Sequence, residues 1–203
     1  MGLRELFGPS REEVWRRLSQ EIGGGFVKGG FARGDKVEVQ HGSWTVTLDT
    51  YVVSTGHSHA VFTRMRAPFV SRDGFRFTIY RQGFWSELGK KLGMQDIEVG
   101  HSVRFDEDFI IKANDESKVR ALLANAEIRR LLDEQPRVRF ELKDDEKLFW
   151  KRFPEGVDEL CFTVHGVIKD VDRLRKLFDL FAEVLDELYR IGSATPENPG
   201  VKL

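Results

Sequence analysis

Residues 105–123 read FDEDFIIKANDESKVRALL, a pattern that predicts a short strand followed directly by a capped helix. Apolar residues at Phe105, Phe109 and Ile111 alternate with charged ones, and a period of two is typical of a half-buried strand. Asn114-Asp115 then offers side-chain oxygens to the free N–H groups of a helix start. The predicted helix has one apolar face, made of Val119, Leu122 and Leu123.

The segments on either side of this stretch predict more strands and four more helices, one of which is a short helix over residues 84–92 that ends at Gly93. Ser10-Arg11-Glu12-Glu13 is a capping box that opens a first helix, and Asn125 and Asp170 can cap two later ones. Apolar alternation predicts strands at 44–52, 61–67, 75–79, 137–143 and 160–167. The last helix carries the clearest stripe: Val171, Leu174, Leu177, Phe178, Phe181, Val184, Leu185 and Leu188. The sequence therefore predicts an α+β fold, with an antiparallel sheet covered by helices on one side.

The domain organisation follows from the order of these elements. Residues 1–192 are predicted to form a single α+β domain. A helix–strands–helix order occurs twice, so the domain has two candidate halves, 10–100 and 105–192, without visible sequence similarity. Residues 193–203 contain two prolines and are predicted to form a flexible tail.

Six shorter phrases accompany the stretch 105–123, namely FGPSREEVW, WTVTLDTY, TRMRAP, GFRFTIYR, GMQDIEVG and FPEGVDEL. Together, over residues 7–192, they resemble a family of uncharacterised bacterial proteins, some of which look membrane-anchored. The resemblance implies a soluble bacterial domain without an anchor. It implies no activity for individual residues.

Composition narrows the range of functions. The net charge is −1, so no global field attracts nucleic acid or acidic lipid, and neither is expected as a partner. Cys161 is the only cysteine, which fits a reducing cytoplasm and predicts a small buried side chain. The sequence contains no run of 18 apolar residues, so it predicts no membrane-spanning helix. We find no phosphate-binding glycine loop, dinucleotide fingerprint or zinc-protease motif, so the sequence predicts no cofactor and favours a non-enzyme.

Arg64, Arg66, Arg76 and Tyr80 are the candidate ligand-binding residues. Arg64 and Arg66 are two apart on one predicted strand, so they share a face, as do Arg76 and Tyr80 on the next. If the loop 68–74 makes these strands antiparallel neighbours, three guanidinium groups converge on one anion, with only Asp49 as an obvious neutraliser. The alternative is a solvated sheet face with cross-strand Arg–Asp pairs.

His57-Ser58-His59 places two imidazoles on one side of a strand, a spacing that can bind a metal ion such as zinc. Such a site needs a third ligand, for which the candidates are His41, His101, Asp49 and Asp96. The alternative is a polar hairpin tip, and the sequence as a whole favours it.

Two functional classes stay open. The first is a non-catalytic binding module that meets a protein partner, a second copy of itself or an anionic ligand. Aromatic residues in predicted loops, namely Phe84, Trp85, Phe149, Trp150 and Phe153, would support it if exposed. The second is a small enzyme or metal-binding protein centred on His57 and His59.

Overall fold

The structure is a computed structural model that describes residues 9–30, 34–56, 58–82, 95–97, 100, 103–143 and 153–203. The predicted short helix 84–92 lies outside these ranges, as do His57, His101 and all the loop aromatics named above except Phe153. The helices are α2 (Arg11–Glu21), α3 (Val103–Asp108), α4 (Glu116–Ala124), α5 (Ala126–Asp133) and α6 (Val171–Arg190). The strands are β1 (Gly25–Val27), β2 (Lys36–His41), β3 (Trp44–Thr55), β4 (Ser58–Val70), β5 (Phe77–Arg81), β6 (Gln95–Asp96), β7 (Phe109–Ala113), β8 (Arg139–Lys143) and β9 (Val157–His165).

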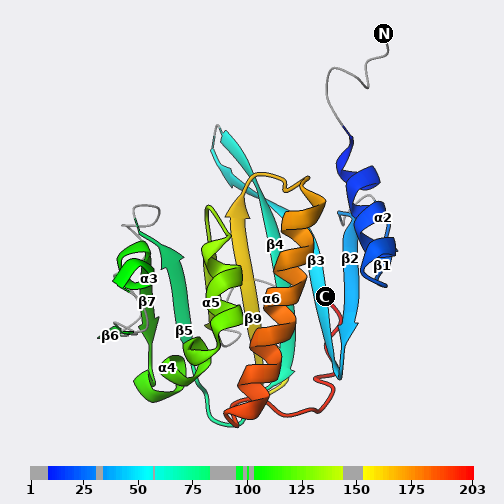
Figure 1. Ribbon diagram of the computed structural model, residues 1–203. Coiled ribbons are helices and arrows are strands. Elements are labelled where there is room, and N and C mark those ends of the chain that lie inside the picture. The colour runs from blue at the N-terminus through cyan, green and yellow to red at the C-terminus, as the bar shows by residue number, and fades with distance from the viewer. Residues whose placement is uncertain are drawn as a thin grey trace.

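The nine strands among the described residues form one sheet in the order β1-β2-β3-β4-β9-β8-β5-β7-β6, and every pairing between them is antiparallel. Helices α2, α4, α5 and α6 pack on one face of this sheet (Figure 1). The predicted α+β class is therefore confirmed. None of the described helices has the length and apolar character needed to cross a membrane.

The strands of the two candidate halves are interleaved in one sheet. Strands β9 and β8 of the second half lie between β4 and β5 of the first. The prediction that β4 and β5 pair through the loop 68–74 was therefore wrong. β4 instead pairs with β9 over eight positions, from Thr63↔Val164 to Val70↔Val157. Strands joined by a short loop often lie side by side, but they need not do so. Here β9, which is distant in the sequence, pairs with β4 in place of β5.

The stretch 105–123 differs from its prediction in one respect. Residues 103–108 form a helix, and the strand begins only at Phe109. Phe105 and Phe109 are four apart, a spacing that also suits one helical face, and their rings lie 4.6 Å apart. The helix after the strand is as predicted, with the Asp115 side chain accepting from the N–H of Lys118.

The other predicted caps are also present. Ser10 and Glu13 form a complete capping box on α2. The Asn125 side chain accepts from two N–H groups at the start of α5, and the Asp170 side chain accepts from the N–H of Arg173 at the start of α6. These local polar contacts explain why the three helices begin where they do.

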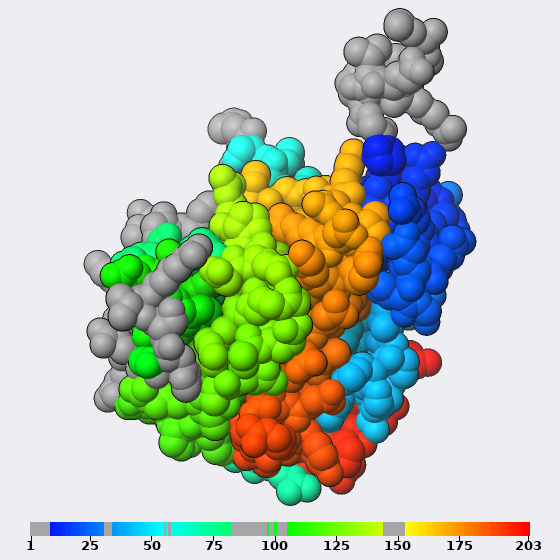
Figure 2. All heavy atoms as spheres, viewed as in Figure 1, coloured from blue at the N-terminus to red at the C-terminus, as the bar shows by residue number. Residues whose placement is uncertain are grey.

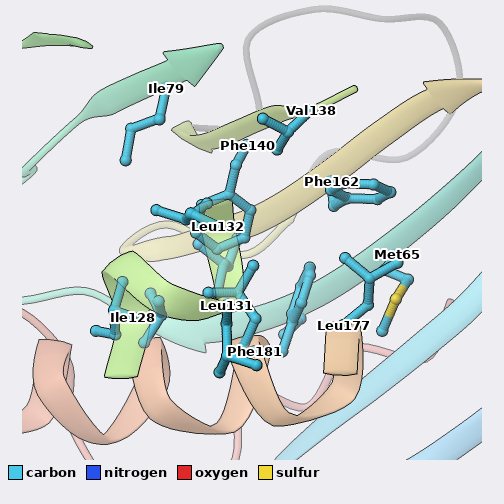
Figure 3. Packing of buried hydrophobic residues seen from close by; sticks show 14 of the residues in the cluster. Met65, Ile79, Ile128, Leu131, Leu132, Val138, Phe140, Phe162, Leu177 and Phe181 are labelled. Carbon is cyan, nitrogen blue, oxygen red and sulfur yellow. The ribbon is translucent and has the colours of Figure 1, made fainter. Parts of the chain in front are cut away.

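The core lies between the sheet and the helices. Leu177 and Phe181 of α6 meet Leu131 of α5 above Phe140 and Phe162 of the sheet (Figure 3). The predicted stripe of α6 is buried as expected, with at most 6% exposure at Leu177, Phe178, Phe181 and Leu185. Viewed from the helix side, α5 and α6 cover the middle of the sheet with a continuous layer of side chains (Figure 2).

The chain after α6 begins as a packed segment, which corrects the predicted flexible tail. Ser193 and Ala194 are buried, and Ala194 forms an isolated bridge with Ser71. The N–H of Thr195 donates to the carbonyl of Val70 at 2.9 Å. These contacts tie residues 193–195 to the end of β4.

Candidate ligand-binding face of the sheet

The sheet face opposite to the core carries the charged side chains of the central strands. Along each strand the side chains alternate between the two faces, so residues opposite one another in the register share a face. One row across this face runs through Asp49, Arg64, Thr163, Arg139 and Tyr80. A second row contains Thr47, Arg66, Cys161, Glu141 and Thr78.

Five of these side chains, together with Glu159 and Lys143 from the next row, form a continuous chain of alternating charge, which we call the charge ladder. In spatial order it contains Arg64, Asp49, Arg66, Glu159, Lys143, Glu141 and Arg139. Each of the three carboxylates bridges two cations, so the ladder has a cation at both ends and one cation in excess.

The contacts in the ladder are tight at its ends and loose in its middle. Arg64 donates two hydrogen bonds of 2.8 Å to the two carboxylate oxygens of Asp49, and Arg66 donates one of 2.7 Å. At the other end, Arg139 donates two bonds, of 2.8 and 3.1 Å, to one oxygen of Glu141. Glu159, by contrast, lies 3.7 Å from both Arg66 and Lys143.

The cationic side chains of the ladder are more exposed to solvent than its carboxylates. The four cationic side chains are 16–43% exposed, with Lys143 the most open, whereas the three carboxylates are only 8–15% exposed. Arg and Lys reach past shorter acids because their apolar stems lie along the sheet and their charged heads approach water. The solvent side of the ladder is therefore positive.

Burial and charge act in opposite directions on the pKa values of these acids. Burial alone would raise the pKa of Asp49, but hydrogen bonds and charges from Arg64 and Arg66 outweigh it and hold the pKa below its ordinary value. For Glu159 burial prevails over the attraction of Arg66 and Lys143, so the pKa of its carboxyl is raised. The difference follows from the longer contacts of Glu159.

Two buried polar atoms in the middle of the ladder stand out. Within the described part of the chain, Arg66 Nε and Glu159 Oε1 have no hydrogen-bond partner. Unpaired buried polar atoms cost free energy, so the middle of the ladder is its least satisfied part.

An aromatic group borders the ladder at Arg64. The Arg64 guanidinium lies over the Tyr51 ring at 4.9 Å, and Tyr51 stacks on Phe62 with ring centroids 5.2 Å apart. The ring of His165 meets Phe62 edge-on at 5.3 Å. Cation–π contact fixes the Arg64 side chain in place.

The four candidate residues named from the sequence do not converge on one point. Arg64 and Arg66 share the face and share Asp49. Tyr80 lies in the row of Arg64 but with β9 and β8 between them, a separation of about 15 Å at ordinary strand spacing. Arg76 lies just before β5 and forms two hydrogen bonds with Asp158, at 2.6 and 2.7 Å. The arginines are thus paired with carboxylates, as in the alternative reading of cross-strand ion pairs.

The histidine pair gains no support from its described member. His59 is exposed on β4, opposite Ser54, and His57 lies outside the described residues. Among the residues that the structure describes, no three His, Cys, Asp or Glu side chains are grouped as metal ligands.

Four of the seven ladder residues, namely Glu159, Lys143, Glu141 and Arg139, were not among the candidates named from the sequence. Alternation in 137–143 does place Arg139, Glu141 and Lys143 on one face of a strand. Nothing local indicates that Glu159 lies beside Arg66, because that contact depends on the pairing of β4 with β9.

Comparisons with known proteins add no relative: no protein-family model matches the chain, and no curated protein or solved structure is significantly similar to it.

Proposed function

We propose that this protein is a non-catalytic binding module that holds an anionic ligand on the solvent side of the charge ladder. The observation that carries the proposal is the layering of charge, with every cation of the ladder more exposed than every carboxylate. An approaching anion meets Arg64, Lys143 and Arg139 first. Guanidinium groups bind carboxylate and phosphate oxygens well because their N–H groups form a planar fork.

The chemistry of the ladder favours binding over catalysis. Arginine side chains donate close hydrogen bonds to the carboxylates of Asp49 and Glu141, which does not suit a base that must accept a proton from a substrate. The adjacent thiol, Cys161, is buried, and burial raises its pKa to about 11, which opposes a nucleophilic thiolate. A single buried thiol also supports the proposal of a cytoplasmic protein.

A titration with small anions tests the proposal. We expect inorganic phosphate and succinate to shift the backbone NMR signals of β4, β8 and β9, and the affinity to fall between low and physiological ionic strength. The variants Lys143→Gln and Arg139→Gln each remove one outer cation and should weaken binding about three- to tenfold. Arg17→Gln is the control, because Arg17 lies on α2 and is paired with Glu21.

The outcomes separate the sources of the anion. Binding of free phosphate or succinate indicates a small ligand, whereas binding of a Glu-rich peptide alone indicates an acidic protein partner at the same face. Equal affinity of Lys143→Gln, Arg139→Gln and wild type for all three probes would exclude the ladder as the site.

A further inference from the structure

The hairpin of β3 and β4 extends beyond the rest of the sheet (Figure 1), and we call its outer part, residues 50–55 and 58–62, the hairpin arm. β2 pairs with β3 only as far as Leu48, and β9 pairs with β4 only from Thr63 onward. Beyond these points the two strands of the arm pair with each other, as far as Thr55↔Ser58. Among the residues that the structure describes, no further strand pairs along either edge of the arm.

The two edges of the arm are not equivalent. On the β4 edge, the N–H of Gly166 donates to the carbonyl of Val61 at 2.7 Å, so part of this edge is occupied. On the β3 edge, the Arg11 guanidinium donates to the Thr50 hydroxyl at 3.0 Å. From Val52 to Ser54, no other segment of the described chain hydrogen-bonds to the β3 edge. The open edge of the arm is therefore that of β3, beyond Thr50.

The backbone groups of Val52 and Ser54 point out of this open edge. In an antiparallel pair, the N–H and C=O groups of successive residues point alternately toward the partner strand and away from it. The Val61 carbonyl binds Gly166 and so points away from β3. Val52 lies opposite Val61 in the register, so its backbone groups point away from β4, as do those of Ser54. Hydrogen-bond donors and acceptors thus line the open edge.

The sequence of the arm lacks the features that usually prevent sheet edges from pairing. No Asp, Glu, Lys or Arg occurs between Asp49 and Arg64, although 32% of the chain is charged. Open edges are ordinarily protected by charged residues, proline or a covering segment. Here Val52 and Val53 are 59% and 38% exposed, and β-branched side chains favour strand pairing. The open edge is therefore suited to another uncharged strand.

We propose that two copies of this chain form a dimer in which residues 51–55 of β3 pair antiparallel across a twofold axis. Val53 lies at the axis, opposite its own copy, and Val52 of one chain lies opposite Ser54 of the other. This register pairs the outward N–H and C=O groups on both sides of the axis. A register centred on Val52 would place Ser54 opposite Thr50, where the edge is already covered.

The absence of charge favours a second copy as the partner. A twofold axis brings the same residues of both chains close together, and like charges that lie opposite each other destabilise a sheet. An uncharged segment meets its own copy without this repulsion. A short strand pair buries less area than a standard protein interface, so we expect a dissociation constant of about 10–300 µM. None of residues 51–55 belongs to the charge ladder, so the dimer is independent of the proposed anion site.

Sedimentation velocity of the whole protein, from about 5 µM to about 1 mM, measures the association. We expect wild type to change from monomer to dimer over this range. Val52→Pro removes an outward N–H without breaking a β3–β4 hydrogen bond. It should weaken the dimer about tenfold or more, because half of the intermolecular hydrogen bonds are lost. Val61→Pro is the matched control, because it makes the same change on the other edge of the arm, and it should associate as wild type.

A charge exchange at residue 53 tests the twofold axis itself. Val53→Lys and Val53→Glu each place like charges opposite each other, so neither variant should dimerise alone. An equimolar mixture of the two should associate, because unlike charges then meet at the axis. This recovery requires residue 53 to lie opposite its own copy, which a dimer through another surface would not provide.

Three results would overturn the proposal. The first is a wild-type protein that stays monomeric at about 1 mM, which would leave the open edge to a strand of another protein. The second is equal weakening by Val52→Pro and Val61→Pro. The third is a mixture of Val53→Lys and Val53→Glu that does not associate. Should Val52→Pro fail to fold, the mixture decides alone.

Discussion

Arg66 approaches Glu159 to 3.7 Å, whereas it donates a 2.7 Å hydrogen bond to Asp49 on its other side. One guanidinium therefore serves two buried carboxylates unequally. The pKa of Asp49 is lowered and that of Glu159 is raised. The ladder thus contains one acid whose charge stabilises the fold and one whose charge opposes it.

Replacing Glu159 by Gln should stabilise the protein at neutral pH. A carboxyl whose folded pKa is raised above its ordinary 4.5 favours folding at low pH and loses that stabilisation as pH rises through the folded pKa. Wild type and Glu159→Gln should therefore be similar in urea unfolding at about pH 4, and the variant more stable at about pH 8. The control is Glu155→Gln, an exposed position in the same segment, which should change the free energy of unfolding by no more than about 0.5 kcal/mol. A variant less stable than wild type at pH 8 would mean that the Glu159 charge stabilises the fold.

Replacing Asp49 by Asn should destabilise the protein at neutral pH, which is the opposite of the effect expected for Glu159→Gln. The change leaves Arg64 without its carboxylate and Arg66 with only the distant Glu159, so we expect a loss of about 2–4 kcal/mol at pH 7. A carboxylate whose pKa is lowered in the folded protein stabilises the fold at pH values above its ordinary pKa of 3.8. This stabilisation is lost as the pH falls through the folded pKa. The difference in free energy of unfolding between wild type and Asp49→Asn, measured by urea unfolding, should therefore be smaller near pH 3 than at pH 7. Glu12→Gln, at an exposed helix pair, should change little at either pH.

Local chemistry accounts for what the sequence could predict. Alternation placed Arg64, Arg66 and Asp49 on one face, and polar caps located the starts of α2, α5 and α6. These features depend on neighbours a few residues away. Arg66 meets Glu159 only because β4 pairs with β9, whose residues are about a hundred positions later. The alternation of apolar and polar residues cannot by itself show which strands are neighbours, since every half-buried strand has the same alternation.

Phe181→Ala tests the core between α6 and the sheet. Phe181 is fully buried and meets the Phe140 ring edge-on at 5.5 Å. The truncation removes buried area and leaves a cavity, so we expect a loss of about 3–5 kcal/mol in urea unfolding. Tyr189→Ala, on the same helix but 52% exposed, should stay within about 0.5 kcal/mol of wild type. A loss under about 1 kcal/mol for Phe181→Ala would mean that the neighbouring side chains close the cavity.

The Cys161 thiol should react only after unfolding. It is 1% exposed, and its pKa of about 11 leaves roughly one molecule in a thousand ionised at pH 8. A chromogenic disulfide reagent should therefore label the thiol of the folded protein far more slowly than that of the protein unfolded in urea. At intermediate urea concentrations the labelling rate should follow the fraction of unfolded protein. Fast labelling of the folded protein would show that the sheet face opens at Cys161 without global unfolding.

Asp73 should hold the segment after α6 in place. Its carboxylate accepts hydrogen bonds from the Phe75 N–H, at 3.0 Å, and the Ser193 hydroxyl, at 2.9 Å, and it pairs with Lys118. Burial would raise the pKa of Asp73, but these partners outweigh it and lower the pKa. Asp73→Ala should therefore cost about 1–3 kcal/mol at pH 7.

The same change should loosen residues 193–195 before the rest of the fold. The measurement is hydrogen exchange at the N–H of Thr195, which donates to Val70, compared with amides in the middle of α6. We expect Asp73→Ala to speed exchange at Thr195 more than in the helix, because a local anchor is lost while the core is kept. Asp186→Ala, which removes an exposed carboxylate of α6, is the control and should leave Thr195 unchanged. Equal acceleration at both places would mean that Asp73 stabilises the whole domain and does not act as a local anchor.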